Sequence, residues 1–124
     1  MSRDHRKLEA FRFADNLVVT TYKLTTELPK EERYGLQSQI RRAAVSVATN
    51  IVEGSARPST PDYRRFPQLA HGSAREAAYL LGLCARLGYL SLERVSLVAD
   101  RYDHVAAMLL KVAENVSTHD ARIP

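Results

Sequence analysis

Two glutamates and a histidine are the side chains in this 124-residue sequence whose chemistry could support catalysis or metal binding. Glu53, Glu76 and His71 carry groups that serve in general acid–base catalysis and as ligands of divalent metals. A dinuclear metal site in a helix bundle requires Glu-x-x-His pairs, because residues three positions apart face the same side of a helix. The residues three positions before the four histidines are Ser2, Gln68, Arg101 and Val116. We therefore predict no metal, no cofactor and no catalytic residue, and keep a metal-dependent or enzymatic bundle as the alternative.

Cys84 and one pair of surface residues are the remaining candidates for chemistry. Cys84 lies on the apolar line of Leu80 and Leu81 with no histidine at helical spacing, which favours a core residue over a nucleophile. As the only cysteine it cannot form an internal disulfide, which is typical of proteins in a reducing compartment. Asp100 and His104 are spaced i, i+4 and could hold one metal ion, but a surface ion pair is the preferred interpretation.

A stripe of polar residues runs directly beside the apolar stripe of segment 36–57. With a turn of about 100° per residue, each set projects along one line of a helix. The polar line holds Gln39, Arg42, Ser46, Asn50, Glu53 and Arg57, and the apolar line holds Ile40, Ala44, Val47 and Ile51. A solvated face normally lies opposite the core, so polar groups at its edge indicate partners on another helix or another subunit. We predict a structural polar network of Gln39, Ser46, Asn50, Glu53, Ser73 and Glu76.

Basic residues are concentrated in the middle of the chain, which has a net charge of +4. Residues 30–90 hold nine Lys/Arg against five Asp/Glu, so the surplus lies there. Arginine binds phosphate and carboxylate groups with the same planar fork. We predict a patch for RNA or a nucleic-acid-binding protein, with an ordinary charged rim as the alternative. Its members are Arg41, Arg42, Arg57, Arg64 and Arg65.

Four segments with a period near 3.6 must position these side chains. The predicted helices span residues 8–28, 36–57, 61–88 and 91–117. Pro29 is expected to end the first helix, while Gly88 and Ser91 have the residue types that cap the third and fourth helices. Short connections between long helices favour an all-α, antiparallel up-down-up-down four-helix bundle, formed by residues 1–124 as a single domain. Pro67 is expected to kink or restart the third helix.

Apolar residues also lie outside the four core faces, which favours a homo-oligomer. The predicted interface residues are Val45, Val52, Leu83, Leu97 and Met108. The sequence is 45% hydrophobic and 26% charged, as is typical of a globular protein. Because no signal-peptide segment and no apolar run of about 18 residues is present, we predict a cytoplasmic protein without membrane contact.

A family resemblance lies in the residues of the polar stripe and their neighbours. It rests on Tyr34-Gly35-Leu36, Gln39 to Ala43, Ser46, Asn50 to Gly54, Ala70, Gly72-Ser73, Glu76 and Leu87 to Leu90. These residues resemble the four-helix-bundle family of proteins encoded in intervening sequences of bacterial 23S ribosomal RNA genes. The pair Asn-Ile-x-Glu-Gly and Gly-Ser-x-x-Glu is the most specific part.

The resemblance implies a small cytosolic protein that assembles into a ring-like homopentamer, in a family that mostly has no assigned activity. A related branch comprises the accessory proteins of diversity-generating retroelements, which bind a reverse transcriptase and nucleic acid. By this likeness Asn50, Glu53, Ser73 and Glu76 form the structural signature, and the arginines face a partner.

Together these observations predict a non-enzymatic, homo-oligomeric binding or scaffold protein that associates with RNA or an RNA-associated protein. The expected pentamer has a mass of about 70 kDa, five times 13.9 kDa. The alternatives are an enzymatic or metal-dependent bundle that uses Glu53, Glu76 and His71, or a purely structural oligomer without a ligand.

Overall fold

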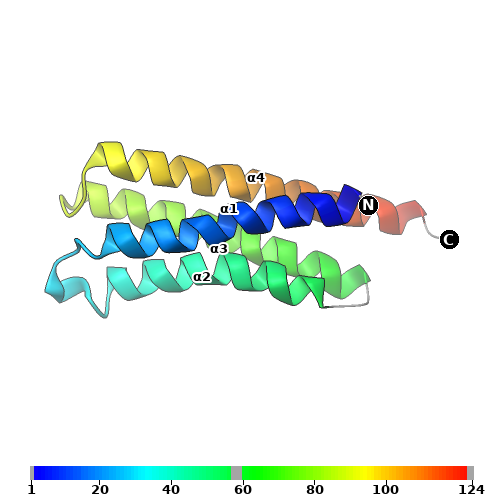
Figure 1. Ribbon diagram of the computed structural model, residues 1–124, viewed down its shortest axis with the longest axis horizontal. Coiled ribbons are helices and arrows are strands. Elements are labelled where there is room, and N and C mark those ends of the chain that lie inside the picture. The colour runs from blue at the N-terminus through cyan, green and yellow to red at the C-terminus, as the bar shows by residue number, and fades with distance from the viewer. Residues whose placement is uncertain (1, 57–59, 123–124) are drawn as a thin grey trace.

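The chain forms four long α-helices that lie side by side (Figure 1). The computed structural model describes residues 2–56 and 60–122. The helices are α1 (Ser2–Thr25), α2 (Leu36–Ser55), α3 (Thr60–Arg86) and α4 (Leu92–Arg122), and a short 3₁₀ helix, η1 (Lys30–Glu32), precedes α2. The described part of the chain contains no strand. Because successive helices run in opposite directions, α1 begins and α4 ends at the same end of the bundle. This is the predicted antiparallel up-down-up-down arrangement.

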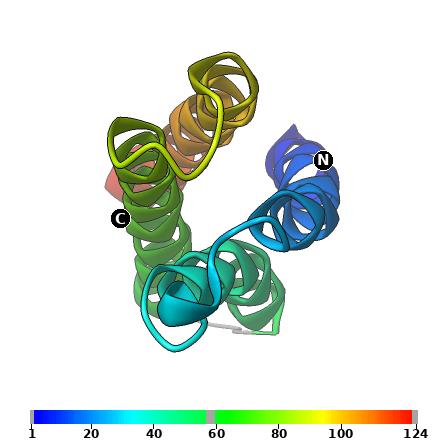
Figure 2. The same cartoon turned by 90° about the vertical axis from the view of Figure 1, so that its left-hand side faces the viewer.

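The four helices pack in a closed square (Figure 2). Each helix packs against the next one in the chain, and α4 packs against α1. The diagonal pairs, α1 with α3 and α2 with α4, make no backbone contact within the described ranges. The seam between α2 and α3 and the seam between α4 and α1 therefore lie on opposite sides of the bundle.

The interior is filled by the apolar stripes that the helical period predicts. Its largest fully buried side chains include Tyr102, Ile40, Leu81 and Leu109, and Cys84 is also fully buried. Gly54 allows α2 to approach α3 closely, because a Cβ at this position would lie 2.9 Å from the Cβ of Phe66. Small residues at this seam therefore set the spacing of the two helices.

Helical spacing continued from Cys84 predicts that Leu87 faces the core, and this prediction is wrong because its side chain is 51% exposed. The helix ends at Arg86, so the helical projection no longer applies to the next residue. Gly88 adopts a φ of +79°, and the amides of Gly88 and Tyr89 bond to the carbonyls of Ala85 and Cys84. This is a Schellman motif, and it confirms Gly88 as the cap.

The helix boundaries differ from the prediction, most of all at α1 and α4. α1 starts at Ser2 and ends at Thr25, whereas residues 8–28 were expected. The chain leaves the helix before Pro29, because the amides of Glu27 and Leu28 bond three residues back and tighten the last turn. At α4, Ser91 acts as the predicted cap, since its Oγ accepts the amide of Arg94 at 3.3 Å. This helix continues to Arg122, beyond the expected end at residue 117.

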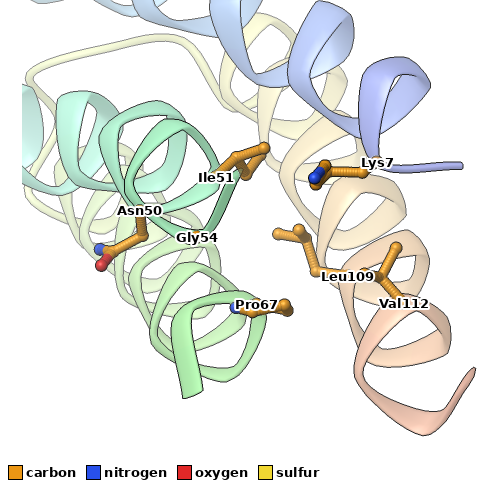
Figure 3. A pocket seen from close by; sticks show the side chains of 7 residues that line it. All are labelled: Lys7, Asn50, Ile51, Gly54, Pro67, Leu109 and Val112. Carbon is orange, nitrogen blue, oxygen red and sulfur yellow. The ribbon is translucent and has the colours of Figure 1, made fainter. Parts of the chain in front are cut away.

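α3 runs through Pro67 without interruption, so the expected restart of the helix is wrong. The proline ring is buried and faces the interior with Leu109 and Val112 of α4 (Figure 3). Burial of the ring against α4 offsets the backbone hydrogen bond that a proline cannot make.

Glu32 fixes the start of α2 and joins the two connections at this end of the bundle. Its Oε1 accepts the amide of Leu36 at 3.1 Å, and its Oε2 accepts the hydroxyl of Tyr89 at 3.2 Å. Gly35 leaves room for the carboxylate, because a Cβ there would lie 2.6 Å from Glu32 Oε1. The carboxylate thus supplies the cap that Gly35, without a side chain, cannot.

Candidate assembly and partner-binding surfaces

Three members of the predicted polar network are joined across the seam between α2 and α3. The Oγ atoms of Ser46 and Ser73 are 2.8 Å apart, which links the two helices by a hydrogen bond. Asn50 Nδ2 donates to the carbonyl and to the Oγ of Ser46, at 2.9 and 3.0 Å. All three residues are half-buried. The Asn50 Oδ1 accepts no hydrogen bond from the described residues and is available to a donor outside this chain.

The other three members of the predicted network lie at the surface. Gln39, Glu53 and Glu76 are exposed. A single chain therefore contains half of the predicted network as a bonded group. Burial of the remaining three side chains requires a second molecule.

The outer surface of α3 next to this seam is apolar and contains an open glycine. Leu69 and Tyr79 are 48% and 61% exposed. A Cβ at Gly72 would meet no atom within 4 Å. We call the surface formed by Ser46, Asn50, Leu69, Gly72, Glu76 and Tyr79 the α2–α3 face.

The five predicted arginines do not form one patch. Arg41 is half-buried and points to the end of α1, where its Nε donates to Thr25 Oγ1 at 2.9 Å and its Nη2 donates to Tyr22 O at 3.0 Å. Its guanidinium also lies over the Tyr22 ring, at 4.5 Å. Gln37 Nε2 donates to Thr25 O at 2.9 Å, so two side chains of α2 satisfy carbonyls of the last turn of α1. Arg41 thus has a structural role that the sequence analysis missed.

The remaining arginines lie at two distant places. Arg42 is exposed near the start of α2, whereas Arg64 and Arg65 are exposed near the start of α3. At about 1.5 Å per residue, these places are roughly 20 Å apart along α2. Arg65 packs over the ring of Phe66 at 4.8 Å. Arg57 lies outside the described residues.

The predicted interface residues are spread over several surfaces. Val52 is 55% exposed and lines a groove between α1 and α2, whereas Leu97 is 60% exposed and lines a groove between α1 and α4. Met108 and Leu83 are partly buried against the core, and Val45 is half-buried on α2. These residues lie on α2, α3 and α4, of which α2 and α4 make no contact within the described ranges, and their role in an interface stays a prediction.

The residues of the metal-dependent alternative do not converge on a site. His71 Nδ1 donates to the carbonyl of Ala106 in α4 at 2.9 Å, which fixes the tautomer of its ring. Within residues 2–56 and 60–122, no group of three His, Cys, Asp or Glu side chains could hold a metal ion. Burial raises the pKa of the Cys84 thiol, and the charge of Glu32 raises it further, so the reactive thiolate is disfavoured.

A groove between α1 and α4 is a basic feature of the surface that the sequence analysis missed. It contains two hollows of about 410 and 280 Å³. The first is lined by Thr20, Lys23, Leu24, Glu27, Arg94, Leu97, Val98 and Arg101, and the second by Arg6, Glu9, Met108 and Lys111. We call these residues together the α1–α4 groove. The groove could have been predicted from helical spacing, which places one set of basic and apolar residues on the same side of α4: Arg94, Leu97, Arg101, Met108 and Lys111.

Two hollows lie beside α2. A groove of about 400 Å³ between α1 and α2 is lined by Leu8, Phe11, Ile51 and Val52, together with Lys7 and Ser55. Figure 3 shows the second hollow, at the end of the bundle, where Ile51, Leu109 and Val112 point inward and Asn50 points away. Its volume of about 10 Å³ admits about one water molecule, so it cannot hold a substrate.

The fold and these surfaces define the class of protein. It is an all-α four-helix bundle that exposes apolar residues on its outer surface. The chain belongs to the family of 23S rRNA-intervening sequence proteins, whose model matches residues 6–111. The resemblance seen in the sequence is thereby confirmed. No helix among the described residues is long and apolar enough to cross a membrane.

A solved structure supports the fold. It is the crystal structure of a protein of unknown function from the S23 ribosomal protein family of Bacteroides thetaiotaomicron. The two chains share 23% identity with a TM-score of 0.74, and the match covers 92% of this chain and 99% of the other. At this identity the likeness establishes the four-helix fold alone. No match was found among curated proteins.

Proposed function

We propose that this protein is a non-enzymatic, homo-oligomeric scaffold of the cytoplasm that associates with RNA or an RNA-associated protein. Its assembly uses the α2–α3 face, and its stoichiometry is a pentamer. The partner contacts exposed arginines, of which Arg42, Arg64 and Arg65 retain exposed side chains in the folded chain.

The open position of Gly72 is the observation that carries this proposal. A glycine in the middle of a helix costs about 1 kcal/mol relative to alanine. Gly54 has a packing reason within the chain, because Phe66 occupies the space of a Cβ, but Gly72 and Gly82 have none. Gly72 differs from Gly82 in lying directly beside Ser73, whose hydroxyl bonds to Ser46 across the seam. A closely approaching helix of a second copy supplies such a reason at Gly72.

The surroundings of Gly72 support the same surface. Leu69 and Tyr79 expose apolar area on either side of it along α3. Asn50 and Ser73 present polar atoms at the neighbouring seam, where a second subunit can complete their hydrogen bonds. Apolar area with adjoining polar groups is typical of a specific subunit interface.

The position of a second apolar surface supports a small closed ring. Val52 and Leu8 are 55% and 51% exposed in the groove between α1 and α2, which lies one side of the square away from the α2–α3 face. In a ring, each subunit uses two different surfaces, and an angle of roughly 108° between them closes five subunits. Two adjacent sides of a square bundle are at about 90°, which favours a small closed ring of four or five subunits, whereas two opposite sides would propagate a filament.

Light scattering coupled to gel filtration tests the assembly. We expect a mass of about 70 kDa, five times 13.9 kDa. Gly72→Ala should reduce this mass, because a methyl group separates the two subunits. Gly82→Ala is the matched control, since it adds the same methyl group to α3 where the chain also leaves open space. A wild-type protein of monomer mass, or equal masses for both variants, would refute assembly through Gly72.

A further inference from the structure

We propose that the α1–α4 groove binds an acidic amphipathic helix of a protein partner. This inference deepens the binding part of the proposed function, on which it rests, by naming the chemistry of the partner and its site. The groove lies on the opposite side of the bundle from the α2–α3 face, so it stays accessible when subunits assemble through that face.

The shape of the groove fits a helix. Between Arg94 and Lys111 it extends over 17 residues of α4, or about 26 Å, which is the length of a helix of roughly 18 residues. Phe13 and His104 pack edge to face between the two hollows, with ring centroids 5.1 Å apart. A helix laid along the seam would contact both hollows and cover this aromatic pair.

The groove also offers apolar anchors. Leu97 is 60% exposed at its rim, while Leu24 and Val98 are buried at its floor. At the other end Met108 lines the second hollow and packs partly against the core. Apolar side chains at i, i+3, i+4 and i+7 of a bound helix would reach these positions.

The charges of the groove select an acidic partner. Its lining includes five Lys or Arg side chains and two Glu side chains. Both carboxylate oxygens of Glu27 accept the guanidinium of Arg94, which lowers the pKa of Glu27 and neutralises its charge. Lys23 and Arg101 make no ion pair with the described residues, so their charges are available to a partner.

A protein helix matches the groove better than RNA or a second copy. RNA would use the cations but leave Leu97 and Met108 without apolar contact. A second copy is disfavoured, because the chain has a net charge of +4 and α1, α2 and α3 each contain more Lys and Arg than Asp and Glu, while α4 has only one acidic residue more than its four basic ones. A helix with leucines on one face and glutamates on its flanks satisfies both the apolar and the charged groups.

Fluorescence anisotropy with a labelled peptide tests this site on the full-length protein. The probe is an 18-residue helix of Leu, Ala and Glu, with leucines at i, i+3, i+4 and i+7 and glutamates on the flanks. We expect the probe to bind at least about tenfold more tightly than a shuffled peptide of the same composition. The same difference is expected against a peptide in which lysines replace the glutamates. Equal binding of the probe and the shuffled peptide would overturn the proposal.

Variants then locate the site. Arg101→Glu should weaken binding of the probe about tenfold, whereas Arg33→Glu, which reverses an exposed charge outside the groove, should change it less than about twofold. Leu97→Gln should also weaken the probe several-fold, yet leave binding of a single-stranded RNA 12-mer unchanged. If Leu97→Gln has no effect while Arg101→Glu abolishes RNA binding, the groove is a nucleic-acid site. If either groove variant changes the mass of the assembly, the groove is a subunit contact and the peptide-binding proposal fails. The proposed assembly through the α2–α3 face is tested separately, by Gly72→Ala.

Discussion

Thr21 and Tyr102 share a hydrogen bond in the interior, although 81 residues separate them in the chain. Their hydroxyl groups link α1 to α4, and both side chains are fully buried. Thr25 extends this link, since its Oγ1 donates to Thr21 O at 2.7 Å and accepts Nε of Arg41. A continuous polar connection therefore runs from α4 through α1 to α2. It holds α1 in place against both helices that flank it in the square.

Removing the hydroxyl of Thr21 should destabilise the fold more than removing that of Tyr102. Thr21→Val leaves the buried Tyr102 hydroxyl with only a long interaction of 3.5 Å with Leu17 O, so we expect the free energy of unfolding to fall by about 2 kcal/mol. Tyr102→Phe should cost about 1 kcal/mol, because Thr21 can turn to a carbonyl of its own helix. Urea unfolding of both variants and of the double variant measures these values. The control Thr26→Val, at an exposed site, should change stability by less than about 0.5 kcal/mol.

Tyr102 should also make the fold sensitive to alkaline pH. Burial raises the pKa of Tyr102 from 10.0 to about 12, against the opposing effect of the hydrogen bond with Thr21. Because the folded pKa is the higher one, the stabilising contribution is complete below about pH 10 and is lost as the pH rises to about 12. As the pH rises from about 10 to about 12, the free energy of unfolding should fall by about 2 kcal/mol more for the wild type than for Tyr102→Phe. Parallel pH profiles of the two proteins would show that this ionisation is not linked to folding.

Gly54→Ala should destabilise the bundle. The new methyl group would lie 2.9 Å from Phe66 Cβ, so α2 and α3 would have to separate locally. We expect the unfolding free energy to fall by about 1 to 3 kcal/mol, as for other overpacked cores. Gly82→Ala has open space and should stabilise α3 by up to about 1 kcal/mol. Thermal unfolding followed by circular dichroism compares the two, and an unchanged melting temperature for Gly54→Ala would contradict the close approach.

Asn50→Leu and Glu53→Leu should impair assembly or folding, because they remove polar groups beside the α2–α3 seam. Asn50 holds Ser46 through two hydrogen bonds, so replacing it also frees Ser46 to move away from Ser73. The control Asn16→Leu makes the same exchange at an exposed site on α1. Light scattering and thermal unfolding are the measurements. Wild-type mass and melting temperature in both stripe variants would mean that these side chains are merely solvated.

RNA binding through the exposed arginines should be weak, independent of sequence and steeply dependent on salt. Removing one arginine–phosphate interaction should reduce the slope of log K against log salt by about 0.7 for a single strand, so Arg42→Gln and Arg65→Gln should each lower it. Arg75→Gln is the matched control, because Arg75 already pairs with Asp103 at 2.8 Å. Filter binding over a range of salt concentrations measures the slope. Affinity that does not change with salt would assign these arginines another role.

Helical periodicity predicted the fold and most of its core correctly. The inward positions of Ile40, Ala44 and Cys84 followed from spacing alone, and Gly88 and Ser91 were identified as caps by residue type. These properties depend on interactions within a few residues of the chain. The errors, at the ends of α1 and at Leu87, occur where the chain leaves the helix and the period no longer applies.

The surfaces were harder to predict, because they combine residues from different helices. In the sequence, Arg41 cannot be distinguished from the other four arginines of the predicted patch. It binds a backbone carbonyl only because α2 packs beside the end of α1. In the same way, Lys23 and Arg101 are distant in the chain. They line the same hollow only because α4 packs against α1.

The sequence by itself therefore determined that this chain is an all-α four-helix bundle of its family, since the apolar period and the capping residues are local properties. Tertiary structure decided which polar groups are joined, which arginines are exposed and where a basic groove opens. The physical reason is that a side chain's exposure and partners depend on the neighbouring helix, whose identity the periodicity of one segment does not encode.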